Sequence, residues 1–188
     1  MVDPTIISRR TLFFAPLALA ACKDRTSIIE LTGSTMGTSY SIIAVDRSGT
    51  LSQRKMQGAV DGVFASVNAQ MSNWDAASEV SRFNASRSTE DFAVSPEFAQ
   101  VMAAANDVRA LSDGHFDVTT GPLIDLWGFG ADTRGTQVPT GDAIASALSA
   151  AGEITVGGAR LQKANPETQV YLSAIGKGYG VAAVGEAL

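Results

Sequence analysis

The hydrophobic residues of this chain follow two different periods, and each period predicts its own kind of element. Runs rich in β-branched and aromatic residues predict strands at 28–32 and 38–45, on either side of a small, polar segment that contains Met36. Between Met56 and Met71, apolar residues recur every three to four positions and predict a helix of about five turns. The sequence from Thr50 to Gln53 fits a capping box at the start of that helix.

The second half of the chain shows the same mixture of helices and short strands. Ser95-Pro96-Glu97 predicts the start of a helix that ends near Ser112, and similar patterns predict helices at 140–151 and 176–188. We also expect a hairpin over 154–161 that turns at Gly157-Gly158, and a short strand at 170–172. Because the strands come as hairpins with helices between them, the expected fold class is α+β.

The composition agrees with a single globular domain and excludes several classes of protein. The chain has 188 residues, of which 45% are hydrophobic and 18% charged, a single cysteine and a net charge of −5. This balance is unlike that of disordered or disulfide-rich chains. Basic residues are scattered in an acidic chain, which argues against a nucleic-acid-binding surface.

The first 21 residues are predicted to be a lipoprotein signal peptide. Arg9 and Arg10 precede an apolar run of 11 residues, which is too short for the ~20 residues that a membrane span needs. The run ends in Leu19-Ala20-Ala21-Cys22, a lipobox, so we expect lipidation of Cys22 and a tether over 22–27. Both the general secretory route and the twin-arginine route fit the two arginines. The mature chain keeps 12 basic and 18 acidic residues, so its net charge of −6 predicts membrane contact through the anchor rather than through the fold.

Four segments combine glycine, an aromatic residue or methionine and a charged residue in a way that packing alone does not require. A planar ligand that carries phosphates needs apolar surfaces against its ring, which Met36, Trp74 and Phe116 offer. It also needs a cation at a helix N-terminus for the phosphates, and Lys177 lies at the predicted start of the last helix. The segments themselves are 35–38, 71–84, 114–130 and 172–180.

Each of these residues also has an ordinary structural explanation. Met36 and Trp74 fit a hydrophobic core, His115 fits a turn, and Asp117 fits a cap. His115 is the single histidine, so the chain offers little for a histidine metal cluster or a Ser-His-Asp triad. The four segments are therefore informative as a set rather than one by one.

Taken in order, the segments resemble the FAD:protein FMN transferase family, the ApbE-like flavin transferases. The shared features are Thr35-Met36-Gly37-Thr38, Met71-Ser72-Asn73-Trp74-Asp75, Gly114-His115-Phe116-Asp117 and Leu172-Ser173-Ala174-Ile175-Gly176-Lys177-Gly178, together with the lipobox. The resemblance covers 28–188. It implies the α+β fold of that family, with only its N-terminal part present in this chain.

The resemblance further implies a Mg²⁺-dependent transfer of FMN from FAD to a threonine or serine hydroxyl of a target protein, with release of AMP. The target would be a subunit of a membrane redox complex, and the enzyme a lipoprotein on the periplasmic face of the bacterial inner membrane. Ala174 would offer its backbone carbonyl to Mg²⁺. The implied FAD-binding positions are Met36, Trp74, His115, Phe116, Asp117, Tyr171 and Lys177.

Two departures and the length of the chain bear on activity. Tyr171 stands where the family has an aspartate, and Ala182 stands where it usually has another. The last predicted helix runs to Leu188, so we expect a missing C-terminal half that carries the catalytic residues and further metal ligands. Activity of this chain alone is left open, and the alternatives are an FAD pyrophosphatase and a catalytically incomplete flavin-binding lipoprotein.

Overall fold

A computed structural model describes residues 26–130 and 138–188. The predicted signal peptide and Cys22 lie outside these residues, as does most of the tether. The described elements, in chain order, are β1 (Ser27–Thr35), β2 (Thr38–Asp46), α1 (Gln53–Met71), α2 (Glu79–Ala85), β3 (Phe92–Ala93), α3 (Pro96–Leu111), α4 (Gly121–Leu126), α5 (Gly141–Ala150), β4 (Ile154–Val156), β5 (Arg160–Lys163) and α6 (Gly176–Ala187).

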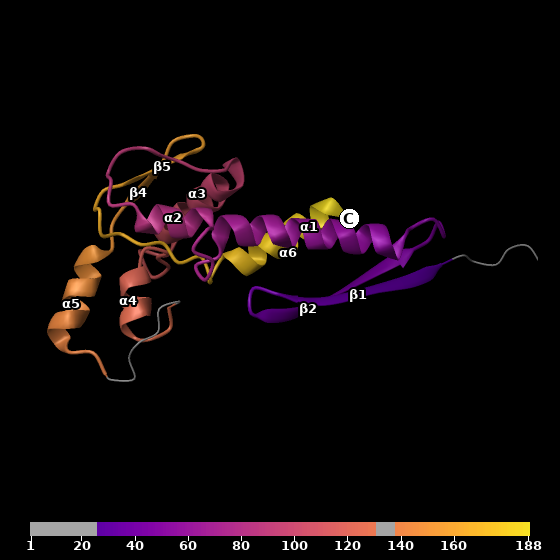
Figure 1. The fold of residues 1–188 in the computed structure, drawn as a ribbon, viewed down its shortest axis with the longest axis horizontal. Helices are drawn as coiled ribbons and strands as arrows, with labels where there is room; N and C mark the ends of the chain where they lie inside the picture. The colour runs from indigo at the N-terminus through magenta and orange to yellow at the C-terminus, as the bar shows by residue number, and fades with distance from the viewer. Residues whose placement is uncertain (1–25, 131–137) are drawn as a thin grey trace, which may run out of the picture.

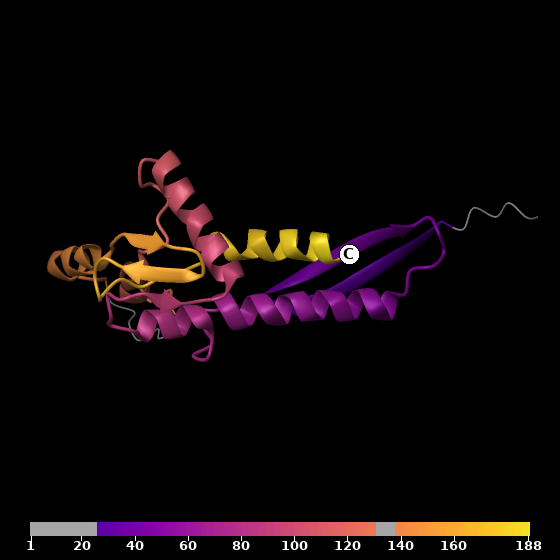
Figure 2. The ribbon, with the colours of Figure 1, turned by 90° about the horizontal axis from the view of Figure 1, so that it is seen from above.

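One end of the elongated molecule consists of the β1–β2 hairpin and two helices (Figure 1). The hairpin is antiparallel from the pair Ser27–Asp46 to the pair Thr35–Thr38. Its inner face packs on α1, and α6 runs alongside α1 (Figure 2). Leu31, Val60 and Val184 from these elements are buried in one cluster, so apolar burial holds the two helices and the hairpin together.

The other end contains the larger hydrophobic cluster and a three-stranded antiparallel sheet in the order β3-β5-β4. Phe83 of α2, Phe98 and Met102 of α3 and Leu161 of β5 are almost fully buried there. The helices and antiparallel strands confirm the predicted α+β class. No helix in the described residues is long and apolar enough to cross a bilayer.

Several local predictions hold and others need correction. The helices expected at 95–112, 140–151 and 176–188 are present as α3, α5 and α6, and Ser95 accepts a hydrogen bond from Phe98 N–H at the start of α3. The predicted capping box is wrong, since Ser52 is the N-cap of α1 and makes no side-chain bond there. The β4–β5 turn is centred on Gly158-Ala159, one residue later than predicted, because Gly157 N–H bonds to Arg160 O.

The loop before α1 is ordered by Asp46 instead of by a capping box. The Asp46 carboxylate accepts hydrogen bonds from Ser48 Oγ and from the backbone N–H groups of Ser48, Gly49 and Leu51. Burial raises the pKa of Asp46, but these bonds lower it by more, so the pKa lies below its usual value. The charged carboxylate therefore fixes the end of β2 against the start of α1.

The strand predicted at 170–172 is not formed, and two asparagine side chains take the place of a neighbouring strand. Asn84 accepts from Val170 N–H at 2.8 Å and donates to Val170 O at 2.9 Å. Asn73 donates to the same carbonyl at 2.7 Å and accepts from Leu172 N–H at 3.3 Å. Val170 is fully buried, so these bonds satisfy backbone groups that water does not reach.

Lys163 supports the helix end that carries Asn84. Its ammonium donates to Ser86 O at 2.8 Å and to Asn84 O at 3.4 Å, and lies 4.7 Å from the centre of the Phe83 ring. A cation at the C-terminus of α2 is favourable for the helix dipole. Burial, with a smaller effect of nearby Arg87, lowers the pKa of Lys163 from 10.5 to about 8.

We predict that Asn84→Ala lowers the free energy of unfolding by about 2–3 kcal/mol, because it leaves the buried Val170 N–H without a partner. The matched control is Asn68→Ala, which removes a single bond to the Thr35 hydroxyl and should cost about 1 kcal/mol or less. Urea unfolding of both variants measures the difference. Equal losses would contradict the role assigned to Asn84.

We also predict that the contribution of Lys163 to stability grows as the pH rises from about 8 toward 10.5. In this range the unfolded chain binds more protons at Lys163 than the folded chain does, so deprotonation favours folding, by at most about 3 kcal/mol. Urea unfolding at several pH values measures this slope. Lys163→Met should flatten it, whereas replacement of the exposed Lys55 by methionine should not.

Candidate functional site

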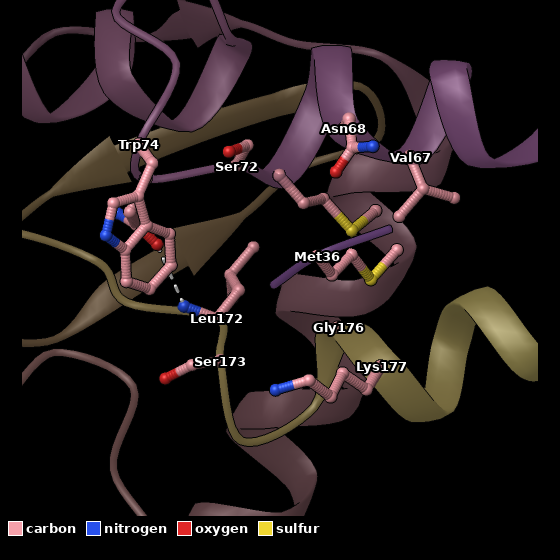
Figure 3. Close-up of a pocket in the computed structure, with 11 residues that line it drawn as sticks. Met36, Val67, Asn68, Ser72, Trp74, Leu172, Ser173, Gly176 and Lys177 are labelled. Atoms are coloured by element: carbon pink, nitrogen blue, oxygen red, sulfur yellow. Dashed lines mark hydrogen bonds between the residues drawn. The ribbon is translucent and has the colours of Figure 1, made fainter. Parts of the chain in front are cut away.

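A pocket of about 90 Å³ lies where the tip of the β1–β2 hairpin meets the C-terminal end of α1 and the start of α6. Figure 3 shows side chains from all of these elements around it. The lining residues are Met36, Val67, Asn68, Met71, Ser72, Asn73, Trp74, Leu172, Ser173, Gly176 and Lys177. Three candidates from the sequence, Met36, Trp74 and Lys177, are thus brought together from segments far apart in the chain.

Met36 occupies a backbone position that suits other residues better. Met36 and Gly37 form the two-residue turn of the hairpin with φ angles of 49° and 69°, the left-handed region in which Asn-Gly is the usual choice. The Met36 side chain packs against both hydrophobic clusters, and its Cε would lie 3.0 Å from a Cβ atom at Gly180 of α6. Packing and pocket lining, rather than turn chemistry, account for a methionine here.

Trp74 is not a core residue, because 62% of it is exposed. It follows Asn73, which holds the 170–172 segment, and its ring lies 6.5 Å from the Tyr171 ring in an edge-on arrangement. The indole therefore stands at the side of the pocket with area left to contact a ligand (Figure 3). A large exposed aromatic ring beside apolar lining residues is suited to packing against a planar group.

Lys177 is the second residue of α6, and its exposed side chain reaches along the pocket toward Ser173 (Figure 3). It forms no ion pair with a carboxylate in the described part of the chain. The preceding turn closes with bonds from the N–H groups of Ile175 and Gly176 to Leu172 O. A cation in the first turn of a helix, next to an apolar pocket, is an arrangement suited to a phosphate group.

The segment of His115, Phe116 and Asp117 does not line this pocket. His115 is exposed after the left-handed residues Asp113 and Gly114 that end α3. Phe116 packs against the larger hydrophobic cluster. Asp117 accepts from Arg109 Nε at 3.0 Å and from the N–H and hydroxyl of Thr119 at 2.7 Å each, so its carboxylate is engaged in ordering the turn before α4.

Tyr171 and Ala174 flank the pocket without lining it. Tyr171 is buried, and its hydroxyl donates to Asp125 at 2.5 Å, so a carboxylate from α4 lies beside this position. Ala174 is exposed in the turn that leads into α6. The described residues contain no group of three or more histidine, cysteine, aspartate or glutamate side chains placed to hold a metal. By themselves they do not make a complete Mg²⁺ site, which needs several oxygen ligands.

Asn73 and Asn84 are two structurally important residues that the sequence pattern does not single out. Both lie in the segment 71–84 with its aromatic and charged residues, yet their amides bind backbone rather than ligand. The sequence does contain one signal, the short apolar segment 170–172, whose backbone groups need partners once it is buried. Such a segment requires side-chain partners for its backbone groups.

Comparison with known proteins gives a consistent result. A family model described as the ApbE family matches residues 36–188. FAD:protein FMN transferases of Vibrio cholerae and Haemophilus influenzae are 39% and 38% identical to the chain, each over 92% of its length. The chain spans about half of these relatives, 52% of each.

Solved structures agree with these matches. The structure titled Flavin Transferase ApbE from Vibrio cholerae superposes with a TM-score of 0.83 at 39% identity, over 86% of this chain and 53% of that one. The apo form of Pseudomonas stutzeri flavinyl transferase ApbE gives a TM-score of 0.81 at 31% identity, over 86% of this chain and 51% of that one. The described fold therefore matches about half of the fold of these proteins.

We predict that Gly180→Val destabilises the protein by about 1–3 kcal/mol, because a branched side chain there overlaps Met36 and approaches Phe64. Gly185→Val is the matched control on the same helix, since a Cβ atom at Gly185 meets no atom within 4 Å. Denaturant unfolding compares the two. A loss at Gly180 no larger than that at Gly185 would show that Met36 is not tightly packed against α6.

Proposed function

Because the chain belongs to the ApbE family, we propose that it forms the FAD-binding part of an FAD:protein FMN transferase. The observation that carries this proposal is that Met36, Trp74 and Lys177 line one and the same pocket. These residues supply an apolar surface, an exposed aromatic ring and a cation at a helix N-terminus. An isoalloxazine ring needs the first two, and a pyrophosphate needs the third.

In the proposed reaction, a threonine or serine hydroxyl of a target protein attacks the phosphorus of the FMN half of FAD. A phosphate ester forms, the bond from that phosphorus to the bridging oxygen breaks, and AMP leaves with the electron pair. The hydroxyl proton passes to a base. Mg²⁺ bound to the pyrophosphate would neutralise its charge, and Ala174 is the one residue here that the family resemblance offers to the metal.

The role of this chain is then to hold and orient FAD. Lys177 and the N-terminal turn of α6 would bind the pyrophosphate, and Trp74 and Met36 would hold the ring. Fixing the phosphorus for in-line attack accounts for much of catalysis in phosphoryl transfer. The acceptor would belong to a membrane redox complex, close to the proposed lipid anchor.

We predict that Trp74→Ala weakens FAD binding by about tenfold, the loss of one ring-stacking contact. Trp127→Ala is the control, since Trp127 is 46% exposed and does not line the pocket.

Lys177→Gln should weaken FAD binding by about tenfold yet leave riboflavin, which has no phosphate, nearly unaffected. Titration by flavin fluorescence measures each dissociation constant, and absence of FAD binding by the unmodified chain would overturn the proposal.

Turnover by this chain is decided by incubating it with FAD, Mg²⁺ and a threonine-containing acceptor peptide. A peptide that gains the mass of FMN identifies a transferase. Free FMN and AMP with an unchanged peptide identify an FAD pyrophosphatase. FAD that stays bound and intact identifies a flavin-binding protein that lacks the rest of the catalytic site.

We also propose that Cys22 is lipidated and that the protein resides on the periplasmic face of the inner membrane, on the strength of the lipobox. Cys22→Ser should abolish fatty-acid labelling and move the protein from the membrane to the soluble fraction. Replacement of Arg9 and Arg10 by lysine should block export if the twin-arginine route is used, and leave it intact otherwise. Unchanged labelling of Cys22→Ser would refute the anchor.

A further inference from the structure

The outer face of the β1–β2 hairpin carries an apolar patch at one end. Side chains alternate along the strands, and the set that faces away from α1 includes Ile28, Ile43 and Val45, which are 72%, 67% and 54% exposed. Ile28 and Val45 are direct partners in the register, so their side chains lie side by side. Toward the hairpin turn, the same face is polar, with Thr32, Ser34, Ser39 and Ser41.

Three basic residues lie at the same end of the molecule as this patch, although the chain as a whole is acidic. Arg47 directly follows β2, and Arg54 and Lys55 lie in the first turn of α1 at the same end of the molecule. All three are exposed, and none forms an ion pair with a described carboxylate. Asp46 is buried and bonded to its own loop, which leaves Glu30, opposite Ile43, as the acid on the outer face. The net charge of the whole chain therefore does not describe the local charge at this end of the molecule.

The patch lies close in the chain to the proposed anchor. Cys22 precedes Ser27, the first residue of β1, by five residues, which span at most about 18 Å when extended. Ser27 lies at the end of the elongated molecule where the two strands are not joined (Figure 1). A lipid on Cys22 would hold Ser27, and with it the neighbouring pair Ile28 and Val45, close to the bilayer surface.

We propose that this end of the molecule, with Ile28, Val45 and Arg47 at its centre, docks on the surface of an anionic lipid bilayer. This inference rests on the proposed lipidation of Cys22. The apolar side chains would enter the headgroup region while the basic residues meet lipid phosphates, the usual division for interfacial binding. The few side chains suffice because the anchor makes docking intramolecular and the effective concentration of lipid high.

Docking of this end sets the height of the pocket above the membrane. Met36 lies nine residues beyond Ser27 along the hairpin, about 30 Å at the rise of a strand. The hairpin then acts as a spacer that presents the pocket to acceptors standing on the same membrane. A tether alone would leave both height and orientation undefined.

The test couples the mature chain, which begins at Cys22, through that single cysteine to a maleimide lipid in phosphatidylglycerol–phosphatidylethanolamine vesicles, with or without brominated lipid. This supplies the anchor chemically, so the result does not depend on lipidation in the cell. Val45→Trp adds an indole within the patch. Ser39→Trp adds one on the same face of the same strand, six residues nearer the pocket, and the unmodified chain gives the background of Trp74 and Trp127.

We expect the indole at position 45 to lose emission in brominated vesicles and to shift to shorter wavelength, while the variant at position 39 matches the background. No added quenching at position 45 would overturn the proposal. Equal quenching at both positions would show the hairpin lying flat and would also overturn it. A shift at position 45 that grows with protein concentration in the absence of vesicles would identify a second copy as the occupant instead.

Discussion

The arrangement of this site depends on how one buried, irregular segment satisfies its backbone hydrogen bonds. Residues 170–172 are buried and lie outside any strand, and the amides of Asn73 and Asn84 bind Val170 N–H, Val170 O and Leu172 N–H. The remaining N–H group, that of Tyr171, donates to Val118 O. Asn73 directly precedes Trp74, and the clamped segment leads directly into the turn before Lys177. The same bonds that make the core possible therefore place the aromatic ring and the cation across one pocket.

A second constraint comes from the contact of Met36 with α6. Gly180 leaves room for the Met36 side chain, which joins the tip of the hairpin to both hydrophobic clusters. The left-handed backbone at Met36 is unfavourable for such a residue, and local cost of this kind is tolerated where the side chain has another role. Met36 thus joins the hairpin to α6 and at the same time forms part of the pocket wall.

The sequence predicted the long helices, and it failed where tertiary contacts decide. Apolar spacing indicated α1, and Ser95-Pro96-Glu97 indicated the start of α3. The short elements α2, α4 and β3 are stabilised by neighbours that a local pattern does not contain. Residues 170–172 have the composition of a strand, but asparagine side chains bind backbone groups that a neighbouring strand would otherwise bind. For the site, the sequence indicated Met36 and Trp74 as apolar surfaces and Lys177 as a cation at a helix start, and all three line the pocket. Asp117 was also expected there, but its carboxylate binds groups of its own turn and Arg109.

Side chains alternate between the two faces along the strands of the hairpin, and this alternation stops at the turn. Along the strands, one face packs on α1 and the other is left to solvent, so core packing explains Leu31 but not Ile28 or Val45. At the turn the alternation stops, and Met36 enters the space between α1 and α6. One end therefore contributes to the pocket and the other carries apolar side chains with no partner in the described fold. Because one rigid hairpin carries both ends, a surface that binds Ile28 and Val45 also fixes the distance and orientation of the pocket relative to that surface.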